Sequence, residues 1–237
     1  MKLSIERGTL LKALAQAQSV VERRNTIPIL ANVLIEAQGA AVSFRATDLD
    51  IEVLDRAPAM VERDGATTVS AVMLHEIIRK LPDGALVNLT EDATTGRLTI
   101  AAGRSTFSLA TLPKEDFPIM ATSEYASNFS APAPLLRRLF DKAKFAISTE
   151  ETRYYLNGVY MHTATGDVGP VLRCVATDGH RLARIDAPLP DGAKGMPGVI
   201  VPRKTVNELR KLLDDDTAMI AVSVSETKVR FATPAIT

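Results

Sequence analysis

The sequence predicts an α+β protein made of two tandem, pseudo-symmetric domains, each with two helices packed on antiparallel β-sheets. Three observations support this fold class: an internal repeat, four segments with helical periodicity, and several short segments in which apolar and polar residues alternate. The chain has 237 residues, of which 46% are hydrophobic and 24% are charged. These proportions are typical of globular domains, and the length allows two of them.

The repeat has a nearly constant spacing. An Ala-Thr-Asp tripeptide at 46–48 recurs at 176–178, 130 residues later. The segment at 32–34 has its counterpart at 157–159, and the segment at 74–77 has its counterpart at 206–209. Two copies of one structural plan present equivalent faces, which suits an extended partner better than a small substrate.

Each copy contains two segments with apolar residues at helical spacing. They cover 9–24 and 72–81 in the first copy, and 134–147 and 203–213 in the second. In the third segment Leu136, Leu139 and Phe140 form a stripe that we expect to be buried, with charged residues opposite. Pro134 suits the first turn of this helix, because a proline there gives up no helical hydrogen bond.

The remaining periodic segments alternate as half-buried strands do. They lie at 42–44, 98–100, 107–109, 220–224 and 229–231. Two helices across one face of an antiparallel sheet would cover such strands. The proline-containing stretch 112–118 has no periodicity and suits a connector, so we place the boundary near Ala121. The predicted domains are 1–121 and 122–237.

The predicted helices carry the positive charge. Their net charges are +2, +1, +3 and +3, whereas the whole chain is neutral, with 28 basic and 28 acidic residues. The strands and loops must therefore be acidic, and the molecule is expected to be electrically polarised. A single basic helix is usually solvated surface, but equivalent basic helices in two repeats predict a strip that contacts the phosphates of nucleic acid. Its expected cations are Lys12, Arg137, Arg138, Lys142, Lys144, Arg203 and Lys204.

Other classes of protein have less support. Asp178 and His180 could form a carboxylate-oriented general base if they shared a face of an extended segment, but no nucleophile, phosphate loop or metal-ligand cluster accompanies them. A pure interaction scaffold would explain the repeat but not the basic helices. Cys174 is expected in the core. Charge close to the N-terminus and the absence of a long apolar run predict a cytoplasmic protein with no membrane contact.

Three segments carry a resemblance to a known family. They are 153–158 with the sequence RYYLNG, 175–183 with VATDGHRLA, and 201–204 with VPRK. The stretches 26–32 and 107–118 match as well. These motifs closely resemble the bacterial DNA polymerase III beta subunits, the sliding clamps. The resemblance covers the whole chain and implies the DNA-clamp fold, whose members have three such domains. It therefore implies that this chain stops within the second domain, before its closing strand, and lacks the third.

The resemblance also implies a function. Clamps are non-catalytic accessory subunits of the polymerase holoenzyme, need no cofactor or metal, and join head to tail as homodimeric rings around double-stranded DNA without reading its sequence. A peptide groove binds the replicative polymerase alpha subunit, the clamp loader, other polymerases and repair proteins. For this chain alone, we expect weak peptide binding and weak, salt-sensitive DNA binding.

Individual roles follow from the same resemblance. Arg24, Tyr154 and Tyr155 match residues that touch DNA, with Arg153 beside them. From composition alone, both tyrosines would more often pack in a core with their hydroxyls bonded. The implied peptide groove contains Leu156, Thr177, Gly179, His180, Arg181 and Leu182. Phe107 is implied at the dimer interface.

Overall fold

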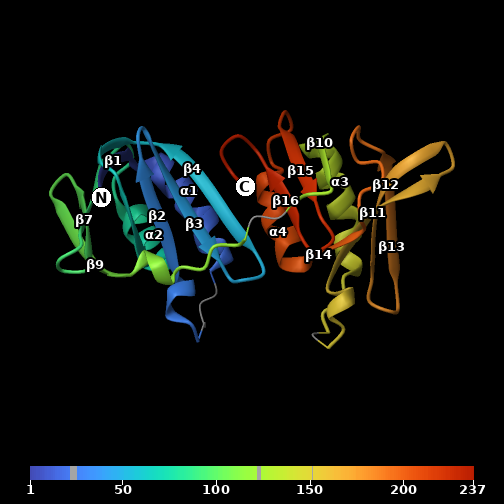
Figure 1. The fold of residues 1–237 in the computed structure, drawn as a ribbon, viewed down its shortest axis with the longest axis horizontal. Coiled ribbons are helices and arrows are strands. Elements are labelled where there is room, and N and C mark those ends of the chain that lie inside the picture. Colours follow the sequence, from blue (N-terminus) through green and yellow to red (C-terminus); the bar gives the residue numbers. More distant parts are fainter. Residues whose placement is uncertain (22–25, 122–123, 151) are drawn as a thin grey trace. The chain divides into compact units, whose positions relative to one another are not determined.

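The computed structural model describes residues 1–21, 26–121, 124–150 and 152–237. The chain divides into two compact units, Met1–Met120 and Ala121–Ala235. Each unit combines antiparallel strands with two α-helices (Figure 1), so the predicted α+β class is confirmed. No described helix has both the length and the apolar character needed to cross a membrane.

The strands of unit 1 form one antiparallel sheet in the order β4-β3-β2-β6-β9-β8-β7-β1-β5. The strands are β1 (Lys2–Glu6), β2 (Asn32–Gln38), β3 (Ala41–Thr47), β4 (Glu52–Pro58), β5 (Met60–Arg63), β6 (Gly65–Ser70), β7 (Leu86–Asp92), β8 (Arg97–Ala102) and β9 (Ser105–Leu112). The helices are α1 (Arg7–Val20) and α2 (Ala71–Lys80), with short 3-10 turns η1 (Pro28–Ala31) and η2 (Lys114–Asp116).

Unit 2 contains two antiparallel sheets, in the orders β10-β15-β16 and β13-β12-β11-β14. The strands are β10 (Ser127–Pro132), β11 (Gly158–Gly166), β12 (Gly169–Thr177), β13 (Leu182–Pro188), β14 (Val199–Pro202), β15 (Met219–Val224) and β16 (Val229–Ala232). The helices are α3 (Ala133–Ala143) and α4 (Arg203–Leu212), and the 3-10 turns are η3 (Lys144–Ala146) and η4 (Tyr154–Leu156).

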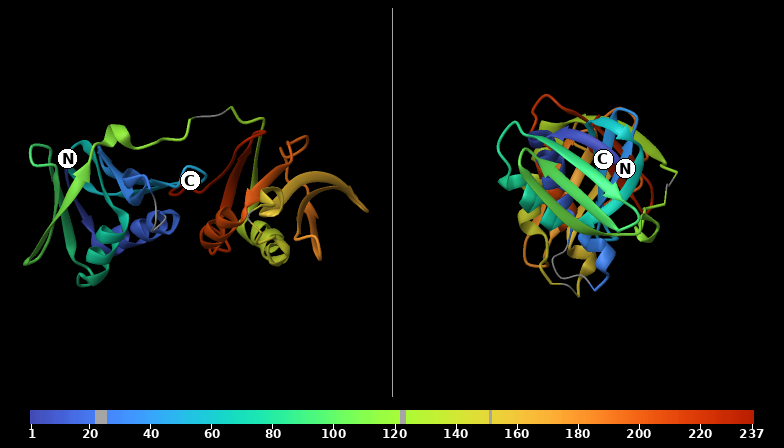
Figure 2. Two further views of the ribbon diagram at one scale, coloured as in Figure 1. Left: turned by 90° about the horizontal axis from the view of Figure 1, so that it is seen from below. Right: turned by 90° about the vertical axis from the view of Figure 1, so that its left-hand side faces the viewer.

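The repeat is visible in how the helices begin. Each of the four α-helices in the described residues starts directly after a strand: α1 follows β1, α2 follows β6, α3 follows β10 and α4 follows β14. In unit 1, α1 packs on β3 and β4; in unit 2, α3 packs on the corresponding strands β12 and β13. The two helices of each unit contact each other and lie on one side of its strands (Figure 2).

Helix α1 begins two residues earlier than the apolar pattern predicts. The carboxylate of Glu6 accepts hydrogen bonds from the backbone N–H groups of Gly8 and Thr9, at 2.8 and 2.7 Å. These bonds satisfy amides that have no partner inside the helix, so the helix starts at Arg7. The same bonds lower the pKa of Glu6.

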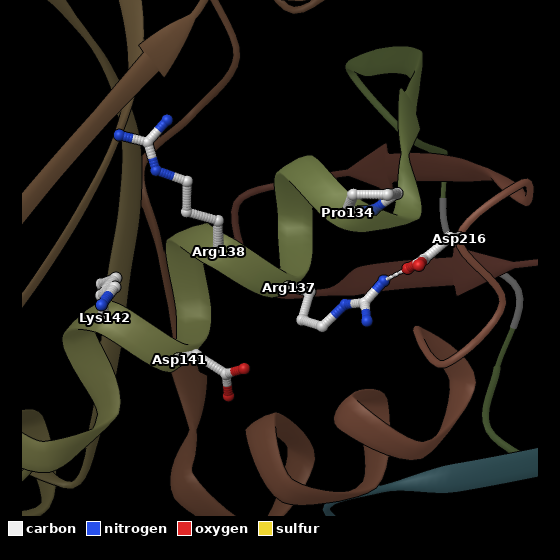
Figure 3. A pocket seen from close by; sticks show the side chains of 6 residues that line it. All are labelled: Pro134, Arg137, Arg138, Asp141, Lys142 and Asp216. Atoms are coloured by element: carbon white, nitrogen blue, oxygen red, sulfur yellow. Dashed lines mark hydrogen bonds and ion pairs between the residues drawn. The ribbon is translucent and has the colours of Figure 1, made fainter.

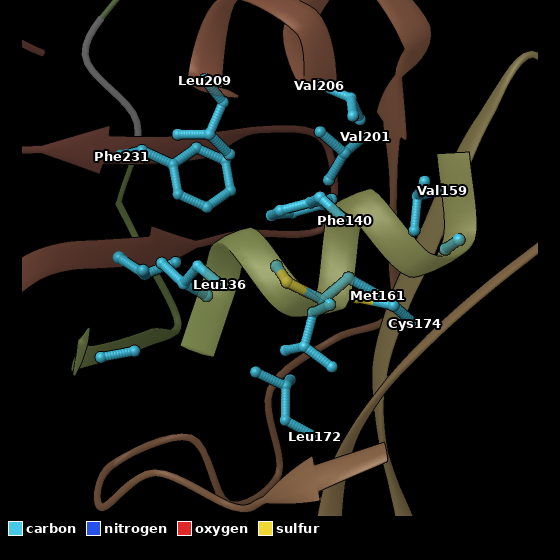
Figure 4. Close-up of a cluster of buried hydrophobic side chains, with 14 of the residues drawn as sticks. Leu136, Phe140, Val159, Met161, Leu172, Cys174, Val201, Val206, Leu209 and Phe231 are labelled. Atoms are coloured by element: carbon cyan, nitrogen blue, oxygen red, sulfur yellow. The ribbon is translucent and has the colours of Figure 1, made fainter. Parts of the chain in front are cut away.

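Each unit has its own hydrophobic core. In unit 2, α3 and α4 place Leu136, Phe140 and Leu209 against both sheets (Figure 4). Phe140 meets Phe231 of β16 edge to face, with ring centroids 6.1 Å apart. Cys174 is fully buried in this core, and burial raises the pKa of its thiol to about 12. The expectation that Cys174 is a core residue is confirmed.

Candidate nucleic-acid interface and peptide groove

The basic residues of α3 and α4 differ in how far they are already paired. Arg138 and Lys142 stand one helical turn apart on α3 and form no ion pair or hydrogen bond within the described part of the chain. Arg137, by contrast, is paired with Asp216. Arg138 and Lys142 are therefore the two α3 cations that can bind an external anion without first losing an internal partner.

Carboxylates close to the helices neutralise several of the other cations. Asp141 lies 2.7 Å from Lys144 and 3.1 Å from Arg210. Burial acts to raise the pKa of Asp141, yet the two cations hold it below its ordinary value. Lys211 is paired with Glu208 at 2.7 Å. The expected separation between basic helices and acidic loops is thus incomplete, because some of the acidic groups lie beside the helix cations.

An open hollow of about 610 Å³ lies along α3. Its lining residues are Pro134, Arg137, Arg138, Asp141, Lys142 and Asp216 (Figure 3). Figure 3 shows Arg137 turned toward Asp216, whereas Arg138 extends in a different direction. The lining contains three cations and two carboxylates, and among these residues Arg138 and Lys142 are the cations that remain available to an external anion.

The other predicted DNA contacts have varied surroundings. Lys12 is exposed on α1, and Lys204 lies on α4. Arg203 donates from its guanidinium to the backbone carbonyl of Ser148, which occupies one of its donors. Arg24 falls outside the described residues.

The tyrosine pair lies on η4 and is solvent-exposed. The exposed fractions are 79% for Tyr154 and 56% for Tyr155, and the rings meet edge to face at 5.6 Å. The alternative that both tyrosines pack in the core is therefore wrong. Backbone hydrogen bonds hold the turn, including Ser148 N–H to the Leu156 carbonyl at 3.0 Å. Arg153, beside the pair, is bonded to Glu150 at 3.0 Å.

The loop after β12 is a tight turn rather than the extended segment expected for the Asp178 and His180 pair. One carboxylate oxygen of Asp178 accepts from the backbone N–H groups of His180 and Arg181, both at 3.0 Å, and the other accepts from the Arg181 guanidinium at 2.8 Å. The backbone bonds lower the pKa of Asp178 to about 2. The Asp178 carboxylate therefore holds the turn and does not orient the His180 imidazole, so the structure does not support a general base at this position.

The same turn occurs in unit 1, 130 residues earlier. Asp48 accepts from the backbone N–H groups of Asp50 and Ile51, and Thr47 accepts from that of Leu49 at 3.0 Å. In unit 2 the Thr177 hydroxyl accepts from Gly179 at 3.1 Å. The duplication therefore extends to individual hydrogen bonds.

Leu49 and Gly179 occupy the same position of this turn, with φ angles of 82° and 90°. A leucine tolerates this conformation in unit 1, so the backbone alone does not demand a glycine. A Cβ on Gly179, however, would lie 3.2 Å from the guanidinium of Arg153. Gly179 thus makes room for Arg153, which the sequence assigned to DNA contact and the structure brings to the predicted peptide groove.

Phe145 of η3 belongs to the same neighbourhood and was missed by the sequence analysis. Its side chain is 57% exposed, and the Arg181 guanidinium lies 5.7 Å from its ring centroid. Leu182, on β13, is also exposed, and η3 contacts this strand. One signal was available: Phe145 is an aromatic residue that falls off the buried stripe of the preceding helix.

Phe107 lies on β9 of unit 1, a strand with one largely unpaired edge. Strand β9 pairs with β8 along one side, but only 111–112 pair with β6 on the other. Along 105–110 the second edge of β9 faces no described strand, and Phe107 is partly exposed there. An unpaired edge of this kind can accept a strand from another chain.

The two α+β units repeat one plan, and each has two helices that carry basic residues. The Asp178 turn does not orient an imidazole for catalysis. This is the organisation of a clamp-type repeat protein. Residues 1–121 match the family described as DNA polymerase III beta subunit, N-terminal domain, and residues 131–237 match the central domain of the same subunit. The chain belongs to the DNA polymerase III beta subunit family, as the sequence motifs predict.

Individual relatives agree with this assignment. The chain is 54% identical over 231 residues to the beta sliding clamp of Caulobacter vibrioides, covering 98% of this chain and 62% of the relative. It is 37% identical over 233 residues to that of Escherichia coli K12, covering 97% and 61%. The solved structure of Caulobacter crescentus pol III beta superposes with a TM-score of 0.96 at 53% identity, covering 100% of this chain and 64% of that one. The chain thus spans about three fifths of the length of these relatives.

Proposed function

We propose that this chain provides two domains of a DNA-replication processivity clamp, with residues 1–121 as the first and 122–237 as the second. The protein is non-catalytic, encircles double-stranded DNA without reading sequence, and tethers the replicative polymerase. The observation that carries this proposal is the superposition of the entire chain on a polymerase III beta subunit at a TM-score of 0.96. The protein acts in the cytoplasm, where replication takes place.

The basic helices support the DNA contact. Arg138 and Lys142 are the unpaired cations of α3, and Lys12 is exposed on α1. Contacts with phosphates position a protein on a duplex without reading its bases, which is what sliding requires. The exposed rings of Tyr154 and Tyr155 add flat surfaces on which a base or sugar can stack.

Charge reversal at Arg138 and Lys142 tests this interface. For the double variant Arg138→Glu, Lys142→Glu, we expect duplex affinity to fall at least about tenfold near 0.1 M salt, and the slope of log K against log salt to shrink by about 2, because two phosphate contacts are lost. Fluorescence anisotropy with two unrelated duplexes measures both quantities. The two duplexes should behave alike.

The control makes the same change in net charge elsewhere. Lys114 and Lys194 are exposed, and Lys114→Glu, Lys194→Glu should leave the salt slope nearly unchanged. Equal losses in both double variants would mean that α3 is ordinary solvated surface and would remove its role in DNA contact.

The turn at 177–182 supports a groove for short hydrophobic peptides. Leu156 and Leu182 supply apolar surface, and Gly179 leaves space next to Arg153. The partners would be the replicative polymerase alpha subunit, the clamp loader, other polymerases and repair proteins. The open edge of β9 with Phe107 would join a second protomer head to tail.

Substitution of Gly179 tests the groove. An alanine Cβ there would lie 3.2 Å from the Arg153 guanidinium, which must then shift. We therefore expect Gly179→Ala to reduce the chemical-shift changes that an unlabelled polymerase alpha-subunit peptide causes at Leu156 and Leu182 of the isotope-labelled chain. Gly195→Ala is the matched control, because its φ of 77° imposes similar strain but its Cβ would meet nothing within 4 Å. Unaltered shifts in Gly179→Ala would place the peptide elsewhere.

A further inference from the structure

An acidic loop follows α4 and is bonded to α3. It contains Asp214, Asp215 and Asp216, and the backbone N–H of Ala133 at the start of α3 donates to the carbonyl of Ala218 at 2.9 Å. Asp215 accepts from the backbone N–H and the hydroxyl of Thr217, at 2.8 and 2.7 Å. These bonds lower the pKa of Asp215 and hold the backbone of the loop in one conformation. The carboxylates of the neighbouring residues Asp214 and Asp216 therefore have defined positions.

Both flanking carboxylates engage helix arginines. Asp216 pairs with Arg137 of α3, and Asp214 pairs with Arg210 of α4. Asp141, on α3 itself, forms a second pair with Arg210 at 3.1 Å. In each case a carboxylate of this chain occupies a guanidinium on a helix that carries the proposed phosphate contacts.

Carboxylate and phosphate are alternative ligands for the same donor. The guanidinium is a planar fork that binds either anion through parallel N–H bonds. Asp216 also lines the hollow that contains Arg138 and Lys142, so a phosphate group inside this hollow would lie close to the Arg137 pair. Two anions cannot share one fork at full strength, and the like charges repel each other.

We infer that Asp216 is a built-in competitor for nucleic-acid phosphate at the α3 hollow, holding Arg137 in the unbound protein and yielding it when a phosphodiester binds. This inference rests on the proposed function. The side chain of Asp216 is 73% exposed, whereas that of Arg137 is 22% exposed. Asp216 can therefore turn into water at little cost, while Arg137 stays in place for the incoming phosphate.

The competitor reduces the net gain from the contact between Arg137 and a phosphate. A free arginine would gain a whole charge-assisted hydrogen bond on meeting DNA, whereas Arg137 exchanges one anion for another. Arg138 and Lys142 attract the backbone first, and Arg137 adds only the difference between its two partners. Such weak, exchangeable contacts suit a protein that moves along DNA, because none of them holds a single register.

Removal of the competitor should strengthen DNA binding. For Asp216→Asn in the full chain, we expect about two- to fivefold tighter binding to random-sequence duplex DNA, the range of an exposed ion pair. We expect the slope of log K against log salt to stay nearly unchanged, because the contact between Arg137 and a phosphate forms in both proteins. Asp191→Asn is the matched control: it makes the same change in charge at an exposed acid of the same unit, outside the hollow. Thermal melting checks that both variants remain folded.

A double-variant cycle identifies the route. In an Arg137→Ala background, Asp216→Asn should have no more effect than Asp191→Asn, because the arginine to be released is gone. If Asp216→Asn and Asp191→Asn change DNA binding equally, or if Asp216→Asn acts without Arg137, competition is refuted. Charge reversal at Arg138 and Lys142 reports separately on the DNA interface, so the proposed function can survive the loss of this inference.

Discussion

Replacement of Phe140 by alanine is expected to lower the unfolding free energy of unit 2 by about 4 kcal/mol. Removal of a buried phenyl ring loses the free energy gained by transferring the ring out of water, and it leaves a cavity. Such changes lower the unfolding free energy by about 3–5 kcal/mol. Phe140 is 1% exposed, and it belongs to the side of α3 that packs in the core formed with both sheets of unit 2. Its ring meets Phe231 of the β10-β15-β16 sheet, so the cavity would open where the helix joins that sheet.

Urea unfolding followed by far-UV circular dichroism measures this effect, with the loss assigned to unit 2 by hydrogen exchange. Phe145→Ala is the matched control, because it deletes the same ring from a position that is 57% exposed. We expect the control to cost less than about 1 kcal/mol, the range of a surface contact with Arg181. Comparable costs for the two variants would show that Phe140 is not the centre of this core.

The helices could be predicted from sequence because their burial is periodic. Leu136, Leu139 and Phe140 recur at helical spacing, and all three are buried on one face of α3. The ends were less predictable. Helix α1 starts at Arg7 because Glu6 reaches forward to two backbone amides, and a capping glutamate three positions before the predicted helical segment is a weak signal among many charged residues.

The pairing of the basic residues could not be predicted. Arg137 meets Asp216 and Arg210 meets Asp141, partners separated by 79 and 69 positions in the chain. A net charge counted along one helix contains no information about such contacts, which depend on how the loop after α4 folds back on α3. The sequence therefore predicted a basic surface, whereas the structure resolves it into occupied and available cations.

The repeat allowed more of the site to be predicted than its local composition would. Two Ala-Thr-Asp tripeptides indicated a shared element, and the structure forms the same carboxylate-capped turn at Asp48 and Asp178. The sequence analysis placed Gly179 in the implied peptide groove. The contact with Arg153 gives this glycine a different neighbour, and it could not be found without coordinates.

Substitution of Asp55 by asparagine is expected to make unit 1 more stable at neutral pH but not in acid. Asp55 lies on β4 and is 5% exposed, on the strand that packs beneath α1. Burial raises the pKa of its carboxyl from 3.8 to about 6, against the opposing effects of the Arg56 backbone N–H and the Lys12 ammonium. The folded state thus binds a proton that the unfolded state has already released.

The sign follows from proton linkage. Between about pH 4 and pH 6 the folded protein holds more protons than the unfolded chain, so the Asp55 contribution to stability is fully present below pH 4 and is lost as the pH rises through 6. A shift of about 2 units corresponds to about 3 kcal/mol. Asparagine does not titrate, so the variant should gain up to this amount relative to the parent on going from pH 4 to pH 7.5.

Chemical unfolding of both proteins at several pH values measures the difference, and Asp50→Asn, at an exposed position of the preceding turn, is the control that should show little pH dependence. A stability difference between Asp55→Asn and the parent that stays constant from pH 4 to pH 7.5 would mean that water reaches the carboxylate.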